Sequence, residues 1–212
     1  MRDPRQARSD YATPPRRAAR PGDRETFFRH WLRDPLGIGA VAPSGRRVAR
    51  AMARQVDLTR PGIVLELGGG TGSVTSALIA AGCPAERLVT IEREPDLAEH
   101  LRRRCPGVRV IRGNACDAER LLAAAGVMAL STVVSSLPIK WFPRAAQRTL
   151  LDACFARLGQ GGAFVQLTNA LASPLATAEL GLMGEEVARI WAHFLPTQIW
   201  RYRRVATAQL AS

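Results

Sequence analysis

A glycine-rich turn directly after a short apolar run constrains the fold of this chain more than any other feature. Residues 63–67 read Ile-Val-Leu-Glu-Leu, and residues 68–72 read Gly-Gly-Gly-Thr-Gly. An apolar run bounded by glycines is typical of a buried strand, and glycines let the backbone turn sharply and come close to a ligand. The pattern predicts a strand, a ligand-binding turn and a helix, which together form the first unit of a doubly wound α/β sheet.

Strand-like and helix-like segments continue to alternate after this turn. The predicted strands are residues 63–67, 88–91, 108–111, 132–135 and 163–168, and the predicted helices are residues 74–81, 95–104, 119–125 and 143–158. We expect Gly159, Gly161 and Gly162 to stop the last of these helices. Strands that alternate with helices form a parallel sheet that is covered on both faces.

The end of the chain has a different pattern. Residues 187–194 and 199–205 form two strand-like runs joined around Pro196, and arginines alternate with aromatic residues in the second run. Such a pair predicts an antiparallel hairpin. The predicted fold is therefore α/β, with a mostly parallel seven-stranded sheet that ends in an antiparallel C-terminal hairpin.

Residues 1–60 precede the sheet and divide into two parts. Residues 1–24 combine four prolines with many charges, a composition that cannot bury a core, so we expect a flexible basic arm. Aromatic residues then recur at helical spacing up to Pro35, and Ser44 is placed to cap a second helix that runs to about Gln55. The expected organisation is the arm at 1–24, amphipathic helices at 25–60 and a ligand-binding domain at 61–212.

The charge of the chain is concentrated near its N-terminus. The formal net charge is +12, and 29 of the 30 basic residues are arginine, with Lys140 the single lysine. Residues 1–60 hold 14 arginines and six acidic residues, a net charge of +8. A basic segment of this kind favours a polyanionic partner, either nucleic acid or an anionic membrane. The alternative is a basic tail that is only solvated.

The first amphipathic helix has the composition of a membrane-surface element. Its apolar face carries Phe27, Phe28, Trp31 and Leu32, and its cations include Arg29 and Arg33. The aromatic side chains can enter the headgroup boundary while the arginines meet phosphates. The alternative is a lid whose aromatic side chains pack against the domain.

The sequence does not favour a transmembrane helix, paired cysteines or a metal site. No run of 18 apolar residues is present, so we expect no transmembrane helix. Cys83, Cys105, Cys116 and Cys154 contain no Cys-x-x-Cys pair and are read as free thiols, as in cytoplasmic proteins. The three histidines lack metal-ligand spacing, so we predict no metal site.

Polar residues follow three successive predicted strands at their carboxyl ends. Glu66 precedes the glycines, where a carboxylate repels pyrophosphate but can accept hydrogen bonds from the ammonium of a methionine moiety. Glu92 ends the next strand, 22 residues past Gly70, where an acidic residue can accept from both ribose hydroxyls. Asn114 follows the third strand, placed to contact an adenine amino group. The three converge on one crevice and predict S-adenosylmethionine as the ligand.

These residues resemble the class I S-adenosylmethionine-dependent methyltransferases, which have a Rossmann-like fold. Residues 66–72 match the ELGxGTG loop of the family, Glu92 its ribose carboxylate, and Asn114 stands where the family usually has Asp. Gly69 replaces a commoner Pro, which we expect to loosen the loop. The resemblance implies that S-adenosylmethionine, with S-adenosylhomocysteine as the product, is held by the following residues: Glu66, Gly68, Gly70, Thr71, Gly72, Glu92, Arg93, Asn114, Ala115 and Ser135.

The residues after the fourth strand bear on what is methylated. Nucleic-acid amino methylases of this fold have Asn or Asp, then Pro-Pro or Leu-Pro, then an aromatic residue. This chain has Ser135-Ser136-Leu137-Pro138, followed by Trp141. The serine at the first position argues against a nucleic-acid base as the substrate.

Residues 25–205 resemble bacterial phospholipid N-methyltransferases, which convert phosphatidylethanolamine stepwise to phosphatidylcholine. The segments that carry the resemblance are residues 28–44, 135–138, 164–166 and 199–202. It implies a lipid amine as substrate and an anionic membrane surface as partner, reached from the cytoplasm at the inner face of the membrane. The family often has Tyr-Gly after the fifth strand, where this chain has Asn169-Ala170.

The residues proposed to position the amine are Ser135, Ser136, Leu137, Pro138 and Trp141, with Tyr11 of the arm as a cover over the cofactor. An aromatic face attracts a methylated ammonium, although Trp141 and Phe142 can equally be core residues. We identify no dedicated general base. The alternatives are an RNA or DNA adenine amino methyltransferase, a small-molecule or protein amine methyltransferase, and a membrane-binding module without activity.

Overall fold

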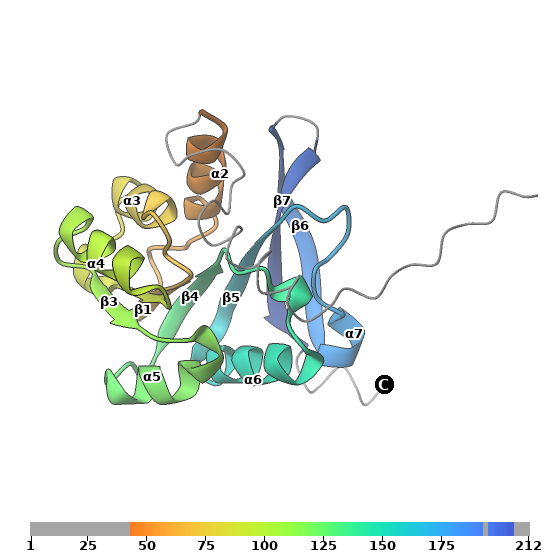
Figure 1. Cartoon of the computed structure of the whole chain (residues 1–212). Coiled ribbons are helices and arrows are strands. Elements are labelled where there is room, and N and C mark those ends of the chain that lie inside the picture. Colours follow the sequence, from red (N-terminus) through yellow and green to blue (C-terminus); the bar gives the residue numbers. More distant parts are fainter. Residues whose placement is uncertain (1–42, 193–194, 206–212) are drawn as a thin grey trace, which may run out of the picture.

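A computed structural model describes residues 43–192 and 195–205, which form one seven-stranded sheet with helices on both faces (Figure 1). The strands are β1 (Ile63–Leu67), β2 (Leu88–Glu92), β3 (Arg109–Arg112), β4 (Leu130–Ser135), β5 (Leu158–Thr168), β6 (Leu182–Ala192) and β7 (Leu195–Arg204). The α-helices are α2 (Pro43–Ala53), α3 (Ser73–Ala80), α4 (Pro95–Arg104), α5 (Ala118–Ala124), α6 (Arg144–Phe155) and α7 (Thr177–Leu180).

The sheet has the order β3-β2-β1-β4-β5-β7-β6. The strands β1 to β5 are parallel, β7 is antiparallel to β5, and β6 is antiparallel to β7. This confirms the predicted α/β class, the mostly parallel sheet and the antiparallel C-terminal hairpin. The strand order reverses beside β1, between β1 and β4, and such a switch point creates a crevice at the carboxyl ends of the strands.

Side chains alternate along the central strands between two separate cores. One core joins Leu65 and Val133 to α5 and α6, and the other joins Val64 and Val134 to α2 and α3. Both faces of a parallel sheet are buried, which is why these strands read as continuous apolar runs. Figure 1 shows α2, α3 and α4 on one side of the sheet and α5 and α6 on the other.

The predicted end of the helix at residues 143–158 was wrong. The helix α6 ends at Phe155, and β5 already begins at Leu158, so that the glycines at 159–162 lie inside a strand. Leu158 pairs with Leu130 of β4, and the register then shifts before Thr132 pairs with Ala163. The glycines therefore form an irregularity within the strand, which the sequence pattern alone presents as a helix stop.

The predicted start of the hairpin was also wrong. The strand β6 begins at Leu182, five residues before the predicted position, and Pro196 lies within β7 opposite Trp191. Gly184 of β6 lies opposite Tyr202, where a Cβ atom would be 2.6 Å from a ring carbon. The glycine is needed because the Tyr202 ring packs over the backbone at this point.

The first predicted helix and the basic arm lie outside the described residues. This applies to Tyr11 and to the whole predicted membrane face: Phe27, Phe28, Arg29, Trp31, Leu32 and Arg33. The second predicted helix is α2, which begins at Pro43, so Ser44 lies within the helix rather than at its cap. None of the helices in the described residues is long and apolar enough to cross a membrane.

Candidate functional site

The glycine-rich loop joins β1 to α3 at the carboxyl edge of the sheet. Gly68, Gly70 and Gly72 have φ values of +79°, +52° and +81°, in a region of backbone conformation that residues other than glycine rarely adopt. A Cβ at Gly70 would have no atom within 4 Å, so the backbone there is open to a ligand.

Gly69 has a different role from the one expected. A Cβ at this position would lie 2.4 Å from Cγ2 of Thr90 and 2.7 Å from Cδ1 of Leu101. A proline would therefore collide with β2 and α4. The glycine does not loosen the loop, because it is what allows the loop to pack closely against its neighbours.

Glu66 lies below this loop and is only 1% exposed. Its Oε2 accepts hydrogen bonds from the hydroxyls of Thr75 and Thr90, at 2.6 and 2.8 Å. Its Oε1 is buried and has no hydrogen-bond partner among the described residues. Burial raises the pKa of the Glu66 carboxyl above its ordinary value, and the two threonine hydroxyls oppose this by lowering it. A buried acceptor without a donor is an unusual cost unless a ligand supplies the donor.

Glu92 closes the other side of the loop. The carboxylate is 1% exposed, and its Oε2 accepts from the backbone N–H of Gly70 at 2.8 Å. Its Oε1 accepts from the backbone N–H of Glu94 at 2.9 Å. Each carboxylate oxygen keeps a second lone pair, so Glu92 can fix the loop and accept from a ligand hydroxyl as well.

The remaining residues predicted for the cofactor follow β2 and β3. Asn114 is exposed, and its Oδ1 accepts from the N–H of Cys116, which caps the short helix η2 (Ala115–Asp117). Ala115 is buried, and the exposed Arg93 pairs with Glu94 at 3.2 Å. The backbone N–H of Gly113 donates to the Glu92 carbonyl, which brings the two strand ends together.

The Ser-Ser-Leu-Pro motif follows β4 and borders the glycine loop. The hydroxyl of Ser136 donates to the Gly68 carbonyl at 2.9 Å, and Ser135 Oγ accepts from the Leu137 N–H at 3.3 Å. The Leu137 carbonyl accepts from the Ile139 N–H and from Nε2 of Gln166. These groups hold the shape of the motif, and both lone pairs of the Leu137 carbonyl are already used.

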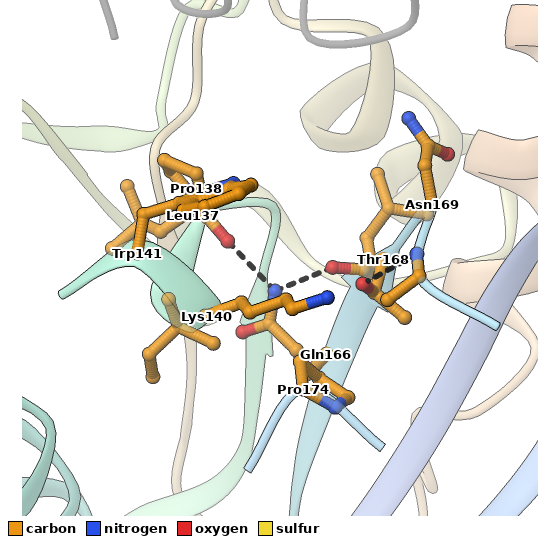
Figure 2. A pocket seen from close by; sticks show the side chains of 11 residues that line it. Leu137, Pro138, Lys140, Trp141, Gln166, Thr168, Asn169 and Pro174 are labelled. Carbon is orange, nitrogen blue, oxygen red and sulfur yellow. Dashed lines mark hydrogen bonds between the residues drawn. The ribbon is translucent and has the colours of Figure 1, made fainter. Parts of the chain in front are cut away.

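A cavity of about 190 Å³ opens beside this motif, between the carboxyl ends of β4 and β5 (Figure 2). On one side it is lined by Leu137 to Trp141 and on the other by Gln166 to Ala170 and Pro174. Of the residues predicted for the amine, Leu137, Pro138 and Trp141 line it. Ser135 and Ser136 lie behind it, toward the glycine loop.

Gln166 lies in a segment of family resemblance, residues 164–166, but was assigned no role in the site from the sequence. It is fully buried on β5, and its Nε2 donates to the carbonyls of Leu137 and Leu167 at 2.8 and 2.6 Å. These two acceptors fix the orientation of the amide, which leaves Oε1 buried without a donor among the described residues. The sequence signal that could have indicated this role is one amide side chain within the otherwise apolar run at residues 163–167.

Lys140 and Trp141 supply a cation and an aromatic face at the cavity mouth. Both residues belong to the short helix η3 (Ile139–Trp141), and both side chains are exposed. The Lys140 ammonium lies 5.8 Å from the centroid of the Trp141 ring. Figure 2 shows the Lys140 side chain extending from η3 toward the side of the cavity formed by Thr168.

Acidic, histidine and cysteine side chains do not gather into a metal site in the part of the chain that the structure describes. All four cysteines are unpaired, and burial raises the pKa of the Cys154 thiol to about 12. The site thus offers carboxylates, backbone groups and amides, but within the described residues no cluster of metal ligands.

Comparison with known proteins agrees with this geometry. Residues 64–162 match the family model described as "Methyltransferase domain". Ornithine lipid N-methyltransferase of Singulisphaera acidiphila is 32% identical over 146 residues, which are 68% of this chain and 74% of that protein. Ribosomal RNA small subunit methyltransferase A of a Synechococcus species is 38% identical over 84 residues, which cover 40% of this chain but only 26% of that protein.

Among solved structures, the fold is similar to 1,6-didemethyltoxoflavin-N1-methyltransferase of Burkholderia thailandensis, which has S-adenosylhomocysteine bound. The TM-score is 0.61 and the sequence identity is 16%, over 89% of this chain and 92% of the other. The chain belongs to the class I S-adenosylmethionine-dependent methyltransferases. It is therefore an enzyme whose cofactor is S-adenosylmethionine.

The described residues fit this cofactor. The unpaired Oε1 of Glu66 can accept from an ammonium, and the open backbone at Gly70 leaves room above the loop. Both features lie at the switch point of the sheet, where proteins of this architecture bind their ligands.

Proposed function

We propose that the protein transfers methyl groups to the primary amine of a membrane lipid, and that phosphatidylethanolamine is converted stepwise to phosphatidylcholine. The observation that carries this proposal is the cavity beside the glycine loop, which presents Lys140 and Trp141 at its mouth. A lipid headgroup carries an amine beside an anionic group. The amine matches the free acceptor inside the cavity, Oε1 of Gln166, and the anionic group matches the cation at its mouth, Lys140. The relative that acts on ornithine lipid supports a lipid amine, and ornithine lipid is the second candidate substrate.

We propose that the cofactor is held by the three strand ends. Glu66 would accept from its ammonium, Glu92 from its ribose hydroxyls and Asn114 from its adenine amino group, with Gly68, Gly70, Thr71, Gly72, Arg93, Ala115 and Ser135 around them. The bound cofactor supplies a methyl group on a sulfonium, which is already a strong electrophile. The protein therefore has mainly to position the amine in line with that methyl group.

The chain's own residues can orient the amine. Because the Leu137 carbonyl is saturated, the free buried acceptor on this side of the cavity is Oε1 of Gln166. We propose that it accepts a hydrogen bond from the amine, while Pro138 and Trp141 shape the walls. The Trp141 face would then stabilise the ammonium that forms as methyl groups are added.

The proton of the amine has no acidic or imidazole acceptor at this position. No Asp, Glu or His is found among the described residues that line the cavity. We therefore propose that the amine loses its proton to solvent before transfer. Solvent deprotonation makes the rate rise with pH toward the pKa of the substrate amine rather than of a side chain.

Incubation with a labelled methyl donor and separated lipids tests the proposal. Vesicles with phosphatidylethanolamine, vesicles with ornithine lipid, and RNA are offered in parallel. Label in phosphatidylethanolamine is the expected result. Label only in ornithine lipid would show that ornithine lipid is the substrate, and the proposed class of substrate, a lipid amine, would still hold. The Gln166→Leu variant should lower transfer to lipid without changing cofactor affinity, because it removes the free amide acceptor. It also removes the two hydrogen bonds to the carbonyls of Leu137 and Leu167, so a thermal melt of the variant is the control for the fold.

The alternative that specific observations favour is methylation of an RNA amino group. It rests on the ribosomal RNA methyltransferase relatives and on the net charge of +12. The serine at position 135 argues against it, since the base-methylating motif has Asn or Asp there. Label that appears in RNA and never in lipid would establish this alternative and refute the proposal.

We further propose that the enzyme works at the inner face of the cytoplasmic membrane, with the segment at residues 25–36 as an anchor. Its support is the pattern of aromatic residues and arginines in the sequence. Replacing Phe28 and Trp31 by Ser should weaken vesicle binding at low and high salt. Replacing Arg29 and Arg33 by Gln should weaken it mainly at low salt, because exposed charges are screened at high salt. A fall in cofactor affinity with unchanged vesicle binding would instead indicate a lid.

A further inference from the structure

Exposed apolar side chains gather at the edge of the sheet where the acceptor cavity opens. Trp141 follows β4 and Leu171 follows β5, and they are 58% and 73% exposed. Trp191 lies near the end of β6 and is 67% exposed. Two antiparallel pairings separate β5 from β6, so β6 runs in the same direction as β5 and ends at the same edge. Three large apolar side chains from three elements thus border one edge of the molecule.

A basic groove of about 560 Å³ lies at the same edge, between α2 and the end of β6. Its charged lining is Arg47, Arg50, Arg54 and Arg189, and Trp191 forms part of its apolar lining. Arg47 and Arg50 lie on α2, and Arg54 directly follows its last residue, with its backbone N–H donating to the Arg50 carbonyl. The spacing of three and four residues places these three arginines on one side of this segment. None of their side chains has a hydrogen-bond or ion-pair partner within residues 43–192 and 195–205, whereas Arg189 pairs with Glu186 at 2.7 Å.

The groove and the acceptor cavity flank the same hairpin. Asn169 lines the cavity, and its Oδ1 accepts from the Thr197 hydroxyl at 3.0 Å. Thr197 pairs across the hairpin with Ile190, which lines the groove. A surface that covers the groove therefore also comes to the mouth of the cavity.

We propose that this edge is a docking surface for an anionic lipid bilayer, distinct from the segment at residues 25–36. The proposal rests on the proposed function, since it explains how a lipid amine reaches the cavity. The arginines of the groove bind lipid phosphates, while Leu171 and Trp191 enter the headgroup region. Cations that have no partner among the described residues, beside exposed aliphatic and aromatic side chains, favour a bilayer over a nucleic acid, whose backbone offers charge but no apolar layer.

Vesicle sedimentation of the full chain with matched variants tests this surface. One variant is Arg47→Gln/Arg50→Gln/Arg54→Gln, and its control, Arg103→Gln/Arg120→Gln/Arg148→Gln, loses the same charge on α4, α5 and α6. A second variant is Leu171→Ser/Trp191→Ser. Its control is Met128→Ser/Met183→Ser, because these two exposed methionines lie before β4 and at the start of β6, on the opposite edge.

The groove variant should bind phosphatidylglycerol-containing vesicles about tenfold more weakly at low salt, with a smaller difference at high salt. The apolar variant should bind more weakly at both ionic strengths, and both controls should bind as the unsubstituted protein does. Unchanged S-adenosylhomocysteine affinity in all variants shows that the fold is intact. Equal losses in the groove variant and its control would overturn the proposal, because net charge would then suffice.

Unchanged vesicle binding together with weakened RNA binding in the groove variant would also overturn it and assign the groove to nucleic acid. The proposed function is tested separately, by methyl transfer from the unsubstituted protein to a lipid amine in detergent micelles. If no lipid amine accepts a methyl group there, the function fails, whereas the sedimentation result still decides the docking surface.

Discussion

At the scale of single residues, two buried carboxylates border the glycine loop, where we propose that the cofactor binds. Glu66 uses one oxygen for two threonine hydroxyls and leaves the other without a donor among the described residues. Glu92 uses both oxygens to hold backbone N–H groups around the glycine loop. In the proposed site, Glu66 would accept from the ammonium of the cofactor, and Glu92 would couple the structure of the loop to cofactor binding.

Glu66 should give the apoprotein a specific pH dependence. Burial raises its pKa, so its contribution to stability is fully present below the unfolded pKa and is lost as pH rises through the folded value. Glu66→Gln removes this titration. Between about pH 4.5 and the folded pKa, the melting temperature of the variant should rise relative to that of the unsubstituted protein. Above the folded pKa, the difference between the two melting temperatures should be constant. Differential scanning calorimetry across this range checks the prediction, and a difference that does not vary with pH contradicts it.

The Glu66→Gln substitution should also lower the affinity of the protein for S-adenosylmethionine. Loss of a hydrogen bond to a charged acceptor costs roughly 1.5–3 kcal/mol, which corresponds to about 10- to 150-fold in affinity. Titration calorimetry with S-adenosylmethionine measures it. Glu99→Gln, at an exposed carboxylate on α4 that pairs with Arg102 and Arg103, is the matched control and should bind normally.

Glu92→Ala should reduce both stability and cofactor affinity. The buried N–H of Gly70 loses its acceptor, at a cost of about 1–3 kcal/mol, and the part-buried N–H of Glu94 loses its acceptor at a smaller cost. Denaturant unfolding and cofactor titration should both respond. If stability falls while affinity is unchanged, Glu92 supports the loop but does not bind the ribose.

At the scale of elements, the loop between β1 and α3 depends on close packing as much as on flexibility. Gly69→Ala should cost about 1–3 kcal/mol of stability, since the added Cβ would lie 2.4 Å from Cγ2 of Thr90. Thr90→Ser removes that methyl group and keeps the hydroxyl that donates to Glu66. The double variant should therefore recover part of the loss in denaturant unfolding. No recovery would mean that Leu101, at 2.7 Å, is the decisive contact.

At the scale of the whole molecule, a cofactor at the proposed site would join the ends of β1, β2, β3 and β4 at the switch point of the sheet. S-adenosylhomocysteine at about 100 times its Kd should stabilise the fold by roughly 2.7 kcal/mol. For a protein of this size that is a shift in melting temperature of about 5–10 °C. NAD⁺ at the same concentration is the control, because the carboxylate of Glu66 beside the glycine loop disfavours a pyrophosphate. An equal shift with NAD⁺ would contradict the cofactor assignment at these residues.

The sequence by itself determined the sheet and the cofactor class. Strand ends carry the polar residues, and strands in a parallel sheet share one carboxyl edge, so Glu66, Glu92 and Asn114 were placed together by chain order alone. The tertiary structure decided what depends on contacts between distant segments. The glycines at 159–162 lie in a strand because β4 pairs with Leu158 before them and with Ala163 after them. Gly69 is required because Thr90 and Leu101 lie against it. Gln166 and the arginines of the groove could be recognised only from the tertiary structure, because folding placed a free amide oxygen at the cavity and brought these arginines beside β6.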